Sequence, residues 1–171
     1  MLRITDNGNS EYVIIIRKNH SASEKTAAEE LAAYLKKITD AEIPVKTDDE
    51  KKTDHEIVIG FTNRGGKGKK ELGEEGFTIK TEGKRLFILG SEVRGALYGV
   101  YSFLEKCCGC RFYTDTCERV PKVNMLTVPE IDCTELPGFE YRNVYWFAQG
   151  GEMISAKLKN NGGMGHELTE R

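Results

Sequence analysis

Residues 75–106 constrain the fold of this chain more than any other stretch. Phe77 and Ile79 alternate with polar residues, a glutamate–glycine pair follows, and the run Arg85–Gly90 is again rich in apolar residues. Alternating apolar residues on either side of a glycine-containing pair are typical of an antiparallel hairpin. The sequence therefore predicts a tight β-hairpin here, and the next residues must be placed relative to it.

A helix is predicted directly after the hairpin, over residues 93–106, because apolar residues recur there at helical spacing. Gly95 and Gly99 lie four residues apart in this segment, and so occupy one face of the helix. A glycine inside a helix costs about 1 kcal/mol relative to alanine. Close contact between this bare face and a sheet or a second helix would offset that cost.

The first half of the chain has the pattern of a strand, a helix and a second strand. Residues 12–17 and 56–60 are nearly continuous apolar runs, which are typical of strands buried on both faces. Between them, Ser21 and Glu24 have the spacing of a capping box at the start of a helix that ends near Asp40. Further short strands are predicted at 43–46, 111–113 and 125–128.

This order of elements predicts an α/β (α+β) fold. One crossover helix joins the first two strands, and the hairpin precedes the second helix. Short connections of this kind favour a mixed β-sheet with the two main helices packed on one face. The length of 171 residues suits one domain of ordinary size with an additional segment.

Charge and hydropathy limit the partners of the chain. The net charge of −2 lacks the basic surplus of a nucleic-acid-binding protein, so no nucleic-acid partner is predicted. No apolar run reaches the roughly 18 residues of a membrane span, and no membrane partner is predicted either. A signal-peptide pattern is not found in this chain, and the compartment stays open, with a secreted or periplasmic parent protein as one alternative.

Two sequence motifs have to be tested as possible binding sites for a cofactor or a metal ion. The glycine-rich loop at 60–67 follows a predicted strand, as a phosphate-binding loop does. Its lysine, however, is not at the position that a phosphate-binding loop requires. Nucleotide binding is therefore a weaker hypothesis than the two functions given at the end of this section. A closed zinc site uses ligand pairs on two separated turns. The cysteines do not form two such pairs; they are Cys107, Cys108, Cys110, Cys117 and Cys133. We therefore predict no cofactor and no metal.

The character of the chain changes after Pro137. Residues 139–148 have the composition of a new strand, and a helix is predicted to begin near residue 152, but no third element follows. We therefore expect residues 1–136 to form one α/β domain and residues 137–171 to be a linker and the start of a second domain. Tyr145 and Trp146 lie in this second part, where they would serve as a sugar-binding platform or as a contact between domains.

Three segments together resemble a known family. The sequences EGFTI at 75–79, RLFILG at 85–90 and RGALYGV at 94–100 resemble the small N-terminal domain that precedes the barrel in β-N-acetylhexosaminidases and α-glucuronidases. Residues 104–113 are most similar to a group of uncharacterised bacterial proteins that pair such a domain with a glycoside-hydrolase-like barrel. The resemblance covers about residues 10–148.

The resemblance implies a non-catalytic domain of zincin-like topology without zinc. In these families it packs against a (β/α)8 barrel of the same chain that holds the catalytic residues, so no catalytic residue is assigned here. The first strand of the barrel begins at a Pro-x-Phe-x-x-Arg pattern, which Pro137–Arg142 matches. Arg142 and Trp146 are accordingly the predicted substrate-binding residues. We expect an accessory domain of a glycoside hydrolase; the alternative is a stand-alone carbohydrate- or protein-binding module.

Overall fold

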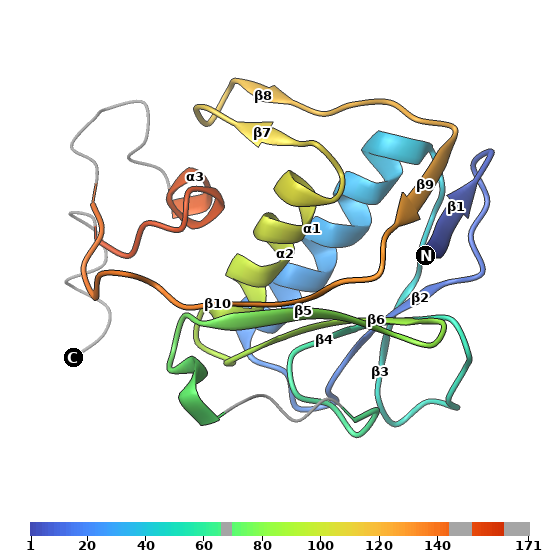
Figure 1. Cartoon of the computed structure of the whole chain (residues 1–171), viewed down its shortest axis with the longest axis horizontal. Coiled ribbons are helices and arrows are strands. Elements are labelled where there is room, and N and C mark those ends of the chain that lie inside the picture. Colours follow the sequence, from blue (N-terminus) through green and yellow to red (C-terminus); the bar gives the residue numbers. More distant parts are fainter. Residues whose placement is uncertain (66–69, 144–151, 163–171) are drawn as a thin grey trace.

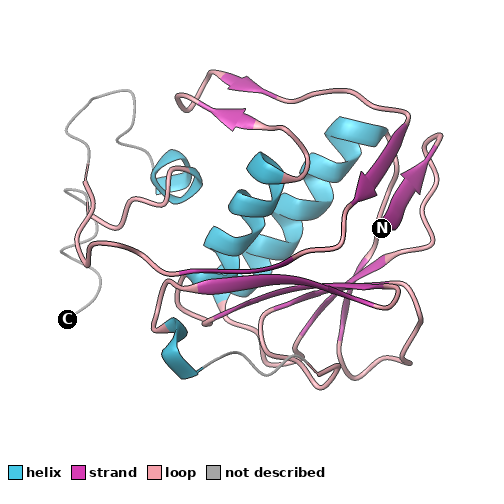
Figure 2. Ribbon diagram, viewed as in Figure 1, coloured by secondary structure: helices cyan, strands magenta, loops and turns pink. Residues whose placement is uncertain are grey.

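The computed structural model describes residues 1–65, 70–143 and 152–162. In this part of the chain, a six-stranded mixed sheet carries the two long helices on one face (Figures 1 and 2). This confirms the predicted fold class. The helices are α1 (Ala22–Thr39), the 3-10 turn η1 (Lys70–Leu72), α2 (Gly95–Lys106) and α3 (Glu152–Lys157). The strands are β1 (Leu2–Asp6), β2 (Val13–Ile16), β3 (Val45–Thr47), β4 (Glu56–Ile59), β5 (Phe77–Glu82), β6 (Arg85–Gly90), β7 (Arg111–Phe112), β8 (Glu118–Arg119), β9 (Met125–Val128) and β10 (Asp132–Glu135).

The strand order in the main sheet is β10-β5-β6-β4-β2-β3. The pairs β3–β2, β2–β4 and β4–β6 are parallel, whereas β5 pairs antiparallel with both β6 and β10. The predicted hairpin is confirmed as β5 and β6, which pair from Phe77 opposite Gly90 to Glu82 opposite Arg85. Two small two-stranded sheets, β1 with β9 and β7 with β8, lie outside the main sheet.

Side-chain alternation in the central strands assigns each residue to one of two faces. Ile57 and Ile59 of β4 point toward the helices and belong to the main hydrophobic core. Val58, between them, points to the opposite face and forms a small separate cluster with Phe87 and Leu89. Both faces of β4 are therefore buried, as its continuous apolar run predicted.

The glycine face of α2 contacts the hairpin, which confirms the close approach expected from the sequence. A Cβ atom on Gly99 would lie 2.7 Å from Cγ2 of Ile88 and 3.2 Å from Cβ of Phe77. A Cβ atom on Gly95 would meet the carbonyl oxygen of Gly76. The helix lies so near the sheet that only glycine fits at these positions.

Helix α1 begins with the predicted capping box. The Ser21 hydroxyl accepts a hydrogen bond from the Glu24 N–H, and the Glu24 carboxylate accepts one from the Ser21 N–H at 2.8 Å. The helix ends at Asp40, which adopts a left-handed conformation with φ of 61°. Glu24 is also buried and bonded to Arg17, so the cap ties α1 to the end of β2.

The cap allows a first prediction. Replacing Ser21 with alanine leaves the Glu24 N–H without its acceptor, and we expect a loss of about 1 kcal/mol in the free energy of unfolding. Urea denaturation followed by circular dichroism measures this loss. The control is Ser21→Thr, because a threonine hydroxyl can accept from the Glu24 N–H and can also donate to the Glu92 carbonyl, as the serine hydroxyl does. This variant should retain most of the stability. Equal losses in both variants would contradict the capping role.

Some predictions of the elements were wrong. The predicted strand at 139–148 is absent from its described part, residues 139–143, and residues 144–148 lie outside the described chain. Val93 was expected in the second helix but precedes it and is 38% exposed. Strands β1, β8 and β10 were not predicted. Strand β10 has only one apolar residue, Cys133, because its place is set by pairing with β5 rather than by its own composition.

The described helices include none that is both long enough and apolar enough to cross a lipid bilayer.

Candidate functional site

Arg142, the first predicted substrate-binding residue, lies in the segment that follows β10 and binds both the domain and its own segment through its guanidinium group. Its Nη2 donates to Oε2 of Glu75 at 2.6 Å. Its Nε donates to the carbonyl oxygen of Lys159 at 2.9 Å, and its Nη1 donates to that of Phe139 at 2.5 Å. All three guanidinium nitrogens therefore bind protein groups, and the side chain is only 22% exposed.

The acceptor of this arginine belongs to the motif that defines the hairpin. Glu75 precedes β5, and its side chain is 8% exposed. Its other oxygen lies 3.4 Å from Nη1 of Arg94, the first residue of the RGALYGV motif. From the same motif, the Tyr98 hydroxyl donates to the carbonyl oxygen of Asn160 at 3.0 Å. Residues of the two motifs thus meet the C-terminal segment at one place.

Burial controls the ionisation of Tyr98. Removal of the phenol from water, with a further contribution from the nearby Glu75 carboxylate, raises the pKa of Tyr98 to about 12. The hydroxyl is therefore protonated at neutral pH and remains a donor to the Asn160 carbonyl. A neutral donor here holds the segment without adding a charge to the buried surroundings.

Two lysines of the C-terminal segment also reach acidic residues of the domain. Lys159 Nζ lies 2.8 Å from Oε2 of Glu105, at the end of α2. Lys157 Nζ lies 3.5 Å from Oε2 of Glu118 and donates to the Tyr34 hydroxyl at 2.7 Å. We use the term clamp for the three ion pairs Arg142–Glu75, Lys157–Glu118 and Lys159–Glu105.

Glu118 is held in its charged form. Partial burial alone would raise the pKa of Glu118, but hydrogen bonds from Tyr34 and Lys37 outweigh it and lower the pKa below its ordinary value. Because the folded pKa is depressed, the stability that Glu118 contributes is present above its ordinary pKa and declines as the pH falls through the folded value. The Lys157 arm of the clamp therefore weakens in acid.

Helix α3 packs on the domain between the arms of the clamp. Ile154 is 2% exposed and belongs to the main core, and α3 contacts α2 (Figure 1). The predicted helix near residue 152 is therefore confirmed. The boundary at 136/137 stays a prediction, but the described part of the segment beyond it packs against the first domain.

The clamp allows a second prediction. Arg142→Met removes three side-chain hydrogen bonds, one of which is also the ion pair with Glu75, while it keeps the aliphatic stem. We therefore expect local opening of residues 152–162 to become about 5–30 times more frequent. Native-state hydrogen exchange of the Leu158 amide, which bonds to the carbonyl of Ile154, measures the opening. Lys122→Met is the control, because its pair with Asp40 is solvent-exposed and should contribute little. Equal exchange in both variants would contradict the clamp.

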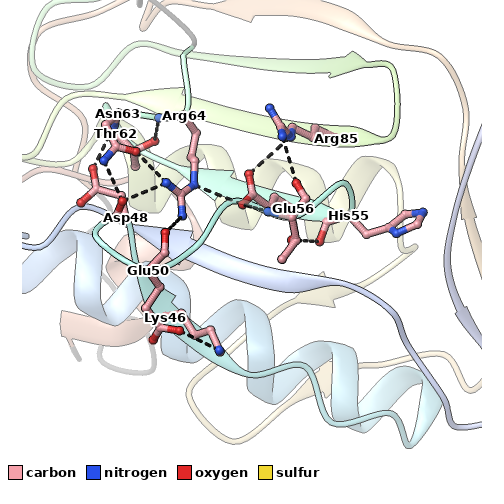
Figure 3. A network of polar contacts seen from close by, with 10 residues as sticks. Lys46, Asp48, Glu50, His55, Glu56, Thr62, Asn63, Arg64 and Arg85 are labelled. Carbon is pink, nitrogen blue, oxygen red and sulfur yellow. Dashed lines mark hydrogen bonds and ion pairs between the residues drawn. The ribbon is translucent and has the colours of Figure 1, made fainter.

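A second polar network lies on the sheet face opposite the helices (Figure 3). Glu56 of β4 points to this face and is completely buried. Its Oε1 accepts from Arg64 Nε at 3.1 Å and from the Thr53 N–H at 2.9 Å. Its Oε2 lies 3.3 Å from Arg85 Nε. Two arginines therefore neutralise one buried carboxylate.

Arg64 joins this carboxylate to the loop before β4. Its Nη1 donates to the carbonyl of Asp48 at 2.9 Å, and its Nη2 donates to the carbonyl of Glu50 at 2.6 Å (Figure 3). A pocket of about 420 Å³ lies beside the network, and its charged lining mixes both signs, with Asp54, Arg64, Glu82, Lys84 and Arg85. Since every nitrogen of Arg64 binds a protein acceptor, the network acts as a structural support for the loop.

The remaining sequence motifs are placed as follows. Gly60 begins the glycine-rich loop with φ of 69°, and a Cβ atom there would lie 2.5 Å from Oε1 of Glu24. A carboxylate at this point disfavours a phosphate, because like charges repel. Residues 66–69 of the loop lie outside the described chain, as do Tyr145 and Trp146, the second predicted substrate-binding residue.

All five cysteines are free thiols. Burial raises the pKa of Cys108 well above its ordinary value and that of Cys110 to about 11, so both are protonated and unreactive at neutral pH. Across residues 1–65, 70–143 and 152–162, three or more His, Cys, Asp or Glu side chains do not come together in an arrangement suited to a metal ion.

The site residues that sequence reasoning missed are the acidic partners of the clamp. Glu75 was named above only as part of a motif, and neither Glu105 nor Glu118 was assigned as a site residue. Nothing in the local pattern distinguishes them, because their partners lie 54 and 39 residues away. Only the packing of α3 onto α2 brings these charges together.

The mixed sheet with its two long helices on one face makes this an α+β domain. The chain belongs to the glycosyl hydrolase family 67 N-terminus family, whose model matches residues 3–103, more than half of the 171 residues. The match includes the hairpin and most of α2, which confirms the resemblance stated from the motifs. An N-terminal domain of this type is non-catalytic.

Solved structures show the same fold. A family GH115 4-O-methyl-α-glucuronidase with specificity for decorated arabinogalactans is 16% identical, with a TM-score of 0.58 over 82% of this chain and 19% of its own. The GH20 β-N-acetylhexosaminidase of Streptomyces coelicolor is 17% identical, with a TM-score of 0.51 over 82% of this chain and 24% of its own. The Streptomyces plicatus β-hexosaminidase is 16% identical, with a TM-score of 0.50 over the same shares.

This chain thus corresponds to about a quarter or a fifth of the chains that it resembles. Among curated proteins, no sequence matches it. The activity and substrates of the longer proteins therefore enter only as proposals.

Proposed function

We propose that this chain is the N-terminal accessory domain of a longer glycoside hydrolase, where it supports a (β/α)8 barrel and one side of the substrate cleft. The family match at residues 3–103 carries this proposal. The solved relatives are glycoside hydrolases in which the equivalent domain is a minor part of a longer chain. The clamp adds a physical reason, because it joins the segment that follows β10 rigidly to the domain.

A support role makes the stability of the catalytic part depend on this domain. In the longer protein, a substitution that destabilises the accessory domain should lower the unfolding temperature of the whole protein in a single transition. Gly90→Ala, argued in the Discussion, provides that substitution. Two results together would refute the support role. One is a calorimetric scan in which the catalytic part unfolds in a separate transition at an unchanged temperature. The other is an unchanged half-life of glycosidase activity.

The chain alone is proposed to have no hydrolase activity. Glycoside hydrolysis requires two carboxylates on opposite sides of the scissile bond in one cleft. The buried acids of the described residues, Glu24, Glu56 and Glu75, are instead paired with arginines of the same chain. Purified chain should release no nitrophenol from a panel of nitrophenyl glycosides. Release that a single-residue substitution abolishes would refute this.

The predicted contact between Arg142 and a sugar stays a prediction. It requires at least one guanidinium nitrogen to leave its present acceptor, because all three are bonded within the protein. Trp146 stays a predicted sugar contact as well. Arg142→Lys in the longer protein should raise KM more than it lowers kcat if the guanidinium binds substrate, because a lysine cannot replace a two-pronged donor.

The alternative is a stand-alone carbohydrate- or protein-binding module. The adjacent aromatic residues Tyr145 and Trp146 are the reason to consider it. Calorimetric titration of the chain with an oligosaccharide panel distinguishes the two. Affinity that is lost in Trp146→Ala and kept in Tyr113→Ala, an exposed aromatic of another region, would favour the module.

A further inference from the structure

We propose that Asn7 is a site of spontaneous deamidation and that the packing of the C-terminal segment protects Asn161 from the same reaction. The Asn–Gly pair occurs twice in this chain, as Asn7–Gly8 and as Asn161–Gly162. In this reaction the backbone nitrogen of the glycine attacks the side-chain amide of the asparagine, and glycine has no Cβ atom to block the approach. The structure around each pair then decides whether the reaction proceeds.

The reaction needs no reagent except water. The Gly8 nitrogen gives up its proton and forms a bond with Cγ of Asn7, while the bond from Cγ to Nδ2 breaks and ammonia leaves with that proton. Water then opens the resulting five-membered imide at either of its carbonyl groups, which yields aspartate or isoaspartate at this position. Because the attacking nitrogen must be deprotonated, the rate of the reaction rises with pH.

The first pair forms the tip of an exposed turn that follows β1. Asn7 and Gly8 have positive φ angles of 47° and 75°, as in the two-residue turns that Asn–Gly pairs favour. Both residues are exposed, and a Cβ atom on Gly8 would meet no heavy atom within 4 Å. Among the described residues, none accepts a hydrogen bond from the Gly8 N–H. The nitrogen that must attack is therefore accessible and free to move.

The second pair is held by the same groups that the reaction would have to move. The Asn161 side chain accepts from the Arg142 N–H at 2.7 Å through Oδ1 and donates to the Glu140 carbonyl through Nδ2. The Gly162 N–H donates to the Arg142 carbonyl at 2.9 Å. Gly162 is also buried against the Tyr141 ring, where a Cβ atom would lie 2.5 Å from Cε2. Attack on Cγ therefore requires the segment to open first, and opening costs free energy.

Deamidation of Asn7 would loosen the turn that contains it. Asp6 and Asn9 exchange two backbone hydrogen bonds of 2.9 and 3.0 Å across the turn, and the Asn7 N–H donates to the Asn124 carbonyl at 2.7 Å. Isoaspartate lengthens the backbone of this two-residue loop, which changes the spacing of these bonds. Either product also places a second carboxylate beside Asp6, and the two charges repel. We therefore expect faster hydrogen exchange of the Asp6 and Asn9 amides in the deamidated chain.

Peptide mapping by mass spectrometry, with chromatographic separation of aspartate from isoaspartate, tests the proposal on the purified 171-residue chain at mildly alkaline pH. Asn7 should convert at least about tenfold faster than Asn161 in the folded chain, because only Asn161 needs local opening. In urea that unfolds the chain, both should convert at similar rates. The turn after β1 and the segment after α3 lie at opposite ends of the molecule, so each rate reports its own site (Figure 1).

Arg142→Met is the variant that links the protection of Asn161 to the C-terminal segment. Because it weakens the attachment of the segment, conversion of Asn161 should become about 5–30 times faster, while conversion of Asn7 should not change. The control is Lys25→Met, whose pair with Glu29 on α1 is solvent-exposed, and it should change neither rate.

Three results would overturn the proposal. The first is equal conversion of the two asparagines in the folded chain, or faster conversion of Asn161. The second is a difference that persists in urea, because the flanking residues rather than the fold would then cause it. The third is an unchanged rate at Asn161 in Arg142→Met. The proposed accessory role would survive each of these results, since the inference does not depend on it.

Discussion

Gly90→Ala should destabilise this protein by at least about 3 kcal/mol, the largest effect that we expect from a single added methyl group. The chain reverses between β6 and α2 so tightly that Gly90 and Gly95 touch through their backbones. A Cβ atom on Gly90 would meet the carbonyl carbon of Gly95 and the Ala96 nitrogen, and would lie 2.6 Å from the Gly95 carbonyl oxygen. Backbone atoms cannot rotate away as side chains can, so α2 would have to move off the hairpin.

Gly138→Ala is the matched control for this substitution. A Cβ atom added to Gly138 would have no neighbouring heavy atom within 4 Å, and its φ is outside the left-handed region, so the change in stability should be within about 0.5 kcal/mol. Guanidinium denaturation monitored by circular dichroism measures both variants. A loss below 1 kcal/mol for Gly90→Ala would show that β6 and α2 can separate at little cost.

Arg64→Met should cost about 3–5 kcal/mol, the second large effect. Glu56 is completely buried, and Arg64 is its hydrogen-bonded partner with a side chain that is 5% exposed. Removing the arginine leaves the carboxylate with the Thr53 N–H and the more exposed Arg85 as partners. It also removes one donor from the Asp48 carbonyl and one from the Glu50 carbonyl. Methionine keeps most of the volume, so the loss measures the charge and the hydrogen bonds rather than a cavity.

The double variant Glu56→Gln/Arg64→Met separates the two contributions. Because glutamine carries no charge, its burial is less costly, and the double variant should be more stable than Arg64→Met alone. The control is Arg3→Met, whose pair with Asp6 is exposed at 67% and 44% and should contribute less than about 1 kcal/mol. If Arg64→Met and Arg3→Met lost equal stability, the buried network would have no special energetic role.

The two substitutions test contacts on opposite faces of the main sheet, and each contact is expected to contribute several kcal/mol to the stability of the domain. On one face, glycines allow α2 to lie directly on the β5–β6 hairpin. On the other face, one carboxylate and two arginines hold the loop between β3 and β4 beneath the sheet (Figure 3).

The segment after β10 shows what can and cannot be predicted from local pattern. The sequence correctly indicated a helix near residue 152, where the structure has α3. It wrongly indicated a strand over residues 139–143, where apolar and polar residues also alternate. Alternation predicts a strand only if a neighbouring strand is available for pairing, and here Arg142 holds the backbone through side-chain bonds instead.

The amino-acid sequence by itself determined the hairpin at 77–90, the two long helices and the glycine face of α2, because each depends on residues that are near one another in the chain. It also determined the family, through motifs of contiguous residues within 3–103. Only the tertiary structure decided that β10 joins the sheet beside β5 and that Glu75, Glu105 and Glu118 receive the cations of the last segment. The physical reason is that strand pairing and ion pairing between distant residues depend on where the packed core places those residues. The sequence around each residue does not indicate which distant residue will be its partner.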